Sequence, residues 1–203
     1  LTDLRSIGLR WPQPGSGHLV VFDPALEVFA QAASATELIL GRVADLQIID
    51  RISIPFVRLD RPLEFSPDGR YLAVAYSGQA LLIYDVAGRR PAFWTRSTEV
   101  VRGVSFSPDS RWIAHVHADR TVRVVRTEDG VEAGRVQSEG QPSRVQFDAS
   151  GQRLAISAGR RLQIVEWATN RVTWRFTHDT LITSLAWQGP MLALGDDAGH
   201  MVF

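Results

Sequence analysis

The sequence contains no cysteine and no lysine, and it has no long apolar run. Without cysteine, the chain has no disulfides, no thiolate zinc ligands and no cysteine nucleophile. All 22 basic residues are arginine and they balance 22 acidic residues, so the formal net charge is zero. Nucleic-acid and anionic-membrane binders gain affinity from basic patches, and a membrane span needs about 18 apolar residues in a row. We therefore expect neither a nucleic-acid nor a membrane partner.

The composition is that of a folded globular protein. The chain has 203 residues, of which 45% are hydrophobic and 22% are charged, which argues against disorder and allows a large core. The first residue is Leu1 rather than methionine, and no signal peptide follows it. Exclusive use of arginine is typical of a GC-rich bacterial genome. We expect a piece of a larger multidomain bacterial protein, located in the cytoplasm.

One motif recurs along the whole chain. The sequence Phe-Ser-Pro-Asp-Gly-Arg-Tyr-Leu-Ala at 65–73 returns in related form at 106–114 and 147–155, so the lead phenylalanines are 41 residues apart. An earlier copy begins at Phe22, at a spacing of 43, and a later one at Trp187, at a spacing of 40. Self-similarity at this period is the mark of a repeat architecture.

Each repeat has the same internal pattern. An alternating apolar run leads into a Ser-Pro-Asp-Gly turn, and three further apolar runs follow, separated by polar or glycine turns. Four short antiparallel strands in about 40 residues make one blade of a β-propeller. We predict an all-β fold, a β-propeller of about five four-stranded antiparallel blades in a single domain over 1–203. The predicted blades are 17–52, 58–96, 100–137, 142–176 and an incomplete 181–203.

The ends of the sequence bear on how the propeller closes. The last repeat stops inside its third predicted strand, whereas residues 4–11 precede the first repeat where a fourth strand would lie. A terminal strand that completes the blade of the other terminus removes exposed sheet edges. Two interpretations stay open: a five-bladed ring closed by residues 4–11, or a segment of a larger ring.

The repeats resemble those of the WD-repeat family over essentially the whole chain. Residues 119–125 and 195–203 are similar to the family's second turn and third strand. The signature Trp-Asp pair falls at 84–85, 125–126 and 165–166, and only the first of these keeps the aspartate. The Gly-His pair is missing, with 178–179 the nearest approach, and no blade has the full His, Ser/Thr, Asp and Trp set. The resemblance implies a propeller that binds other proteins.

Two other propeller classes share the Phe-Ser-Pro-Asp-Gly turn. One is the periplasmic Tol-type protein, and the other is the propeller associated with prolyl-type peptidases. The first alternative predicts a signal peptide upstream of Leu1, and the second predicts a hydrolase domain elsewhere in the same protein.

One cluster has the composition of a metal site. His115, His117 and Asp119 lie two residues apart, and alternate residues of a strand share a face. In the repeat frame, however, His115 takes the place of Val74 and Ile156, which are core positions. We predict that these residues serve packing, and that the chain binds no metal and no cofactor.

The sequence offers no catalytic motif. It has no Gly-x-Ser-x-Gly elbow, and no glycine-rich phosphate loop precedes a helix. Ser143, His178 and Asp179 have no motif that would bring them together as a triad. Asp196 and Asp197 lack the further oxygen ligands that calcium needs. We predict that the chain is not an enzyme.

Two features suggest partner contacts. The longer first spacing places two extra residues around 53–57, so Ile54, Pro55 and Phe56 are expected to expose an apolar loop; the alternative is that they tuck back over the ring. Trp112 follows the Ser-Pro-Asp-Ser turn and is also expected to be exposed. The predicted function is a noncatalytic interaction scaffold or sensor, whose partner is another protein or another domain of the same chain.

Overall fold

The computed structural model describes residues 20–34, 36–54, 63–76, 80–96 and 101–202. Every regular element in these ranges is a strand, and the strands form five antiparallel sheets. Four sheets have four strands, in which each strand pairs with the next along the chain, and the fifth has three. The prediction of an all-β chain is therefore confirmed.

The strands follow one another in blocks of four. The first two sheets contain β1 (Val20–Phe22), β2 (Val28–Ser34), β3 (Glu37–Arg42), β4 (Ile48–Ser53), β5 (Leu63–Phe65), β6 (Tyr71–Tyr76), β7 (Ala80–Asp85) and β8 (Arg90–Arg96). The third and fourth contain β9 (Val101–Phe106), β10 (Trp112–His117), β11 (Thr121–Arg126), β12 (Glu132–Gln137), β13 (Arg144–Phe147), β14 (Arg153–Ala158), β15 (Arg161–Glu166) and β16 (Arg171–Thr177). The fifth contains β17 (Ile182–Gln188), β18 (Met191–Asp196) and β19 (Met201–Val202).

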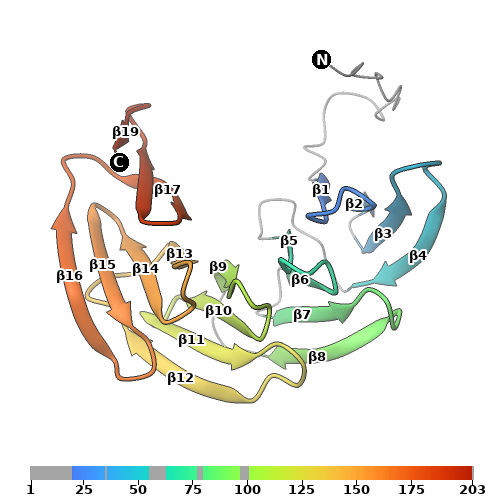
Figure 1. Ribbon diagram of the computed structural model, residues 1–203, viewed down its shortest axis with the longest axis horizontal. Coiled ribbons are helices and arrows are strands. Elements are labelled where there is room, and N and C mark those ends of the chain that lie inside the picture. Colours follow the sequence, from blue (N-terminus) through green and yellow to red (C-terminus); the bar gives the residue numbers. More distant parts are fainter. Residues whose placement is uncertain (1–19, 35, 55–62, 77–79, 97–100, 203) are drawn as a thin grey trace.

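The five sheets stand side by side in an arc (Figure 1). The first strand of each sheet lies on the inside of the arc and the fourth on the outside, as in the blades of a propeller. Over the described residues the arc stays open between the first sheet and the fifth. The open arc fits a segment of a larger ring rather than a closed five-bladed ring. Residues 4–11, predicted as a closing strand, lie outside the described residues.

The repeated turn motif has one structural role in four of the sheets. The side-chain oxygen that follows the lead phenylalanine accepts a hydrogen bond from a backbone N–H five residues later, at 2.7–2.9 Å. The four acceptors are Asp23, Ser66, Ser107 and Asp148. Gly69 and Gly151 have φ near +70°, which glycine adopts without steric cost. The motif thus fixes the hairpin between the first and second strands.

The core lies between neighbouring sheets. Because strand side chains alternate, each inner sheet contributes one face to the junction before it and the other to the junction after it. On β10, for example, Ile113 packs toward the second sheet, whereas Ala114 and Val116 pack toward the fourth. Each junction is therefore a sandwich of two apolar faces.

The arc has two opposite faces. We call the face with the turns after the first and third strands of each sheet the turn face. The connection face carries the turns after the second strands and the links between sheets. There, in the first, third and fourth sheets, the residue after the fourth strand donates its backbone N–H to a carbonyl in the second turn of the same sheet: Ile54 to Thr36, Ser138 to Arg120 and His178 to Arg160 (2.8–2.9 Å).

One expectation on the connection face is wrong. Ile54 is only 2% exposed and belongs to the core between the first and second sheets. Its backbone bond to Thr36 holds the side chain against that core, so Ile54 follows the alternative in which it tucks back. Pro55 and Phe56 lie outside the described residues, so their contact with a partner stays a prediction.

Candidate functional site

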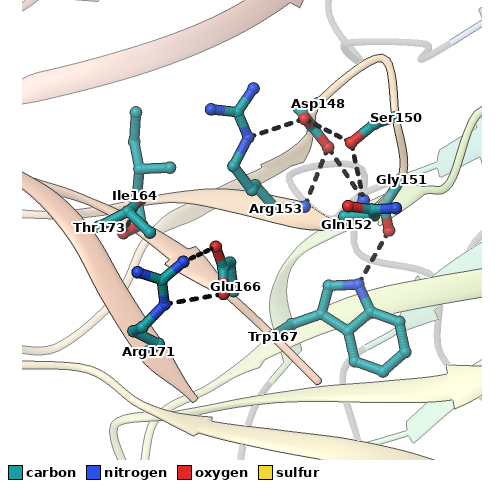
Figure 2. Close-up of polar contacts among 10 residues, drawn as sticks. All are labelled: Asp148, Ser150, Gly151, Gln152, Arg153, Ile164, Glu166, Trp167, Arg171 and Thr173. Atoms are coloured by element: carbon teal, nitrogen blue, oxygen red, sulfur yellow. Dashed lines mark hydrogen bonds and ion pairs between the residues drawn. The ribbon is translucent and has the colours of Figure 1, made fainter. Parts of the chain in front are cut away.

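Trp112 lies half-buried on the turn face, where it begins β10. Its ring packs against Trp167 of the fourth sheet, with ring centroids 5.6 Å apart. The Trp167 indole N–H donates to the carbonyl of Gly151 at 2.9 Å, as Figure 2 shows. Because this hydrogen bond fixes the indole ring of Trp167, the ring of Trp112 packs against a rigid neighbour.

The two tryptophans line a pocket of about 420 Å³ between the third and fourth sheets. Its rim is polar, with Asp109 and Gln152 on first turns and Glu166 at the end of β15. The Arg171 guanidinium donates two hydrogen bonds to the Glu166 carboxylate and forms an ion pair with it (Figure 2). These hydrogen bonds hold the pKa of Glu166 below its usual range. An aromatic floor within a polar rim is the usual anatomy of a protein-binding hot spot.

The turn beside this pocket is strongly constrained. Asp148 accepts hydrogen bonds from the backbone N–H and Nε of Arg153, both at 2.9 Å, and from the hydroxyl of Ser150 at 2.8 Å (Figure 2). Burial opposes ionisation of this carboxyl, but these hydrogen bonds outweigh it and hold the pKa of Asp148 below its usual range. The pocket wall is therefore pre-formed rather than assembled on binding.

The preceding junction has a related pocket with different chemistry. Tyr71 takes the place of Trp112, and the Arg70 guanidinium lies over its ring, 4.9 Å from the centroid. The surrounding pocket of about 440 Å³ is lined by charged side chains of both signs, among them Asp85, Arg90 and Arg126. A pocket of about 610 Å³ between the fourth and fifth sheets also has two aromatic rings in its lining, Trp174 and Phe176, but both lie on the outer strand β16.

The turn face also carries scattered exposed apolar side chains. Each lies in or beside a turn, where no neighbouring sheet covers it: Leu26, Leu46, Val131 and Met191. Single exposed apolar residues are ordinary on a protein surface. Of the four, only Val131 belongs to a sheet that borders the Trp112 pocket, and it does not line that pocket.

His115 and His117 form a buried pair rather than an open site. A hydrogen bond of 2.6 Å joins His115 Nδ1 and His117 Nε2. Burial lowers the pKa of His117 to about 4, and the charge of neighbouring Arg123 contributes next. Burial also lowers the pKa of His115 to about 3, with His117 as the second cause. Asp119 instead accepts from Thr121 and pairs with Arg123. In the described part of the chain, no three potential ligands are grouped to hold a metal ion.

The structure does not assemble the Ser143, His178 and Asp179 set. The hydroxyl of Ser143 lies 3.3 Å from that of Ser157, and His178 Nε2 instead bonds Asp196 at 2.9 Å. The described residues include no helix that could cross a membrane.

Asp196 is the centre of a polar cluster that sequence reasoning did not find. Its carboxylate accepts from the Thr180 hydroxyl (2.5 Å), His178 and His200 Nδ1 (3.2 Å). The pKa of Asp196 lies well below its usual range, mainly because of the hydrogen bond from Thr180. Burial acts in the opposite direction, and the hydrogen bond from His178 lowers the pKa further. The signal was a histidine just before a first strand and an aspartate at the end of the following second strand.

Comparison with known proteins agrees with this geometry. A family described as "WD domain, G-beta repeat" matches residues 92–125, which run from β8 to β11. An uncharacterised WD repeat-containing protein of Synechocystis sp. is 31% identical over 127 residues, covering 61% of this chain and 34% of the relative. The β-propeller domain of Cps50 (Swd1) from Myceliophteria thermophila superposes with a TM-score of 0.78 at 18% identity, covering 90% of this chain and 63% of that one.

Together these findings support a WD-repeat propeller. The likeness to the solved propeller concerns the fold, and the chain spans about a third of the length of the Synechocystis relative. The bonds of His178 and Thr180 to Asp196 bring a histidine, a hydroxyl and an aspartate together in the fifth sheet.

Proposed function

We propose that this WD-repeat chain is a noncatalytic interaction module, which holds a partner protein or another domain of its own chain on the turn face. WD-repeat propellers typically act as protein-interaction scaffolds and are generally noncatalytic. The observation that carries the proposal is the Trp112–Trp167 pair, which lines a pocket at the junction of two sheets.

The pair has the properties of an interface anchor. Trp112 is supported from behind by Trp167 and keeps part of its surface exposed, so a partner side chain gains contact area at little entropic cost. The polar rim of Asp109, Gln152 and Glu166 can satisfy backbone groups of a bound segment.

The test compares two tryptophan substitutions. Trp112→Ala removes the anchor, whereas Trp174→Ala removes an exposed tryptophan of the outer strand β16, which does not line this pocket. Parent and variants are used to capture proteins from the source cell, and a protein retained by the parent is purified and titrated by calorimetry. We expect Trp112→Ala to weaken binding at least tenfold, as for a hot-spot residue, and Trp174→Ala to leave it unchanged. Equal affinity of Trp112→Ala and the parent, with an unchanged circular dichroism spectrum, would refute the proposal.

A further inference from the structure

A second pocket lies on the opposite, connection face, again between the third and fourth sheets. It has a volume of about 290 Å³. One wall is the link after β12, with Ser138 and Glu139, and the other is formed by β14, β15 and β16. The strand residues that matter for its chemistry are Arg161, Gln163 and Arg175.

Two polar atoms in this pocket are buried without a partner. Ser138 and Gln163 are 4% and 5% exposed. The hydroxyl of Ser138 and the Nε2 amide of Gln163 find no hydrogen-bond partner within the part of the chain that the structure describes. A buried donor without an acceptor costs free energy. A ligand that offers an acceptor to both donors would remove this cost.

The fifth sheet shows what kind of group fits the same position. In the fifth sheet, Leu192 pairs with the lead aromatic residue, and Asp196 lies four residues after it on the second strand. In the fourth sheet, Leu154 is the paired residue, and Ala158 lies four residues after it, so Asp196 and Ala158 occupy equivalent positions. In the fifth sheet, the Asp196 carboxylate receives hydrogen bonds from residues of the preceding link. In the fourth sheet, Ala158 lines the pocket and supplies no carboxylate.

The residues that face this position from the preceding sheet, Ser138 and His178, are also equivalent to each other. Ser138 and His178 each follow a fourth strand and donate their backbone N–H to the second turn of their own sheet. His178 bonds Asp196, whereas Ser138 faces a pocket lined by Ala158. A Cβ built on Gly140, two residues after Ser138, would lie 3.2 Å from that of Ala158, so both walls carry small residues here.

The charge of the lining selects the ligand further. Arg161 and Arg175 are positive and Glu139 is negative, which leaves one net positive charge. Glu139 pairs with Arg175 at 2.6 Å, while no ion pair engages Arg161 among the described residues. One positive charge with two neutral donors matches a single carboxylate, whose two oxygens accept several hydrogen bonds. A phosphate dianion would be left undercompensated beside Glu139.

We propose that this pocket binds a carboxylate of an acidic peptide segment from a protein partner, which takes the place that Asp196 fills in the fifth sheet. Ser138 and Gln163 donate to the carboxylate and Arg161 pairs with it. The site lies on the face opposite Trp112, so it goes beyond the proposed function and either can fail without the other.

The test uses blocked tripeptides as probes. Acetyl-Gly-Glu-Gly-amide presents a side-chain carboxylate, acetyl-Gly-Gly-Gly with a free C-terminus presents a terminal one, and acetyl-Gly-Gln-Gly-amide is the neutral control. Binding is followed by NMR chemical shifts of the backbone amides of Ser138 and Leu162, two residues that line the pocket and are kept in every variant. We expect a dissociation constant on the order of 1 mM for the acidic probe, and at least tenfold weaker binding of the glutamine probe. A preference for the terminal carboxylate would assign the peptide end as the source.

Variants decide whether the pocket itself is responsible. Arg161→Gln and Gln163→Leu are each expected to weaken binding at least fivefold, and Arg144→Gln, an exposed arginine outside the lining, to leave it unchanged. Ala158→Asp supplies an internal carboxylate, so it should abolish probe binding and raise the unfolding temperature relative to Ala158→Asn. Equal binding of the Glu and Gln probes, no binding at about 10 mM, or unchanged binding in Arg161→Gln would overturn the proposal. Trp112→Ala should not alter probe binding, which separates this site from the proposed function.

Discussion

The hydroxyl of Ser105 accepts a hydrogen bond from the backbone N–H of Phe147 at 3.2 Å, across the junction of the third and fourth sheets. One junction earlier, the carboxylate of Glu64 accepts from the N–H of Phe106 at 3.4 Å. Ser105 and Glu64 both immediately precede the lead phenylalanine of their own repeat. One repeat position therefore ties consecutive sheets together, with a neutral acceptor in one case and an ionisable one in the other.

Glu64 makes stability depend on pH. Burial raises the pKa of Glu64 to about 7, against the opposing effect of the Phe106 hydrogen bond. The folded state therefore binds this proton more tightly than the unfolded state, so the contribution is fully present below about pH 4.5 and is lost as pH rises through 7. We expect urea unfolding to show a loss of roughly 2–3 kcal/mol over this window, and Glu64→Gln to remove it.

The control for this prediction is Glu27→Gln, at an exposed carboxylate of the first sheet. It should leave the pH profile of the parent unchanged. A Glu64→Gln profile that parallels the parent between pH 4.5 and 7.5 would show that this carboxyl is not the group that titrates.

The histidine pair predicts the opposite pH dependence. Burial lowers the pKa of both His115 and His117, so both are neutral in the folded state. Arg123 faces the pair from β11, and Arg135 and Glu132 from β12. The unfolded state binds more protons below about pH 6.5, so stability falls as pH drops from 6.5 toward 4.

A double substitution isolates this effect. His115→Ile/His117→Ala introduces the residues that the fourth sheet has at the same register, Ile156 and Ala158. We expect its unfolding midpoint in urea to change less between pH 6.5 and 4.5 than that of the parent. Zinc should not raise the unfolding temperature of the parent, and a zinc-dependent rise that His115→Ala removes would show instead that the pair binds metal.

The turn motif made the strands predictable because its causes are local. Each acceptor and its N–H donor are five residues apart, so sequence spacing alone reveals the hairpin. The position of His115 in the core also followed from the repeat frame. Residues repeated in register occupy equivalent places, and the strand alternation then fixes which face they share.

What sequence reasoning missed depends on contacts between distant elements. Ile54 was expected to be exposed because its segment carries the insertion, but its burial depends on the second sheet packing beside it. Trp112 and Trp167 belong to different repeats, and their ring contact follows from the packing of two sheets. The pocket lined by Ala158 is marked by a missing carboxylate, which becomes visible only when the fifth sheet is aligned with the fourth in space.

Gly130 is predicted to tolerate no side chain. It has φ of +74°, and a Cβ there would lie 2.6 Å from the ring of Phe93 in the second sheet. Gly130→Ala should lower the free energy of unfolding by about 1 kcal/mol for backbone strain and by a further 1–3 kcal/mol or so for overpacking. Gly189 has φ of +56° with open space around it, so Gly189→Ala reports strain alone. Equal losses in urea unfolding would show that Phe93 moves aside without cost.

The burial of Ile54 leads to a prediction about stability rather than binding. Its side chain packs with residues of the first and second sheets, so Ile54→Ala should lower the free energy of unfolding by about 2–4 kcal/mol through lost burial and a residual cavity. Ile48→Ala, on the outer strand of the same sheet, is a matched control because Ile48 is 47% exposed, and its cost should stay within about 0.5 kcal/mol. Both are measured by urea unfolding. If Ile54→Ala behaved like Ile48→Ala in unfolding yet lost a bound partner, Ile54 would be a contact residue, as the sequence first suggested.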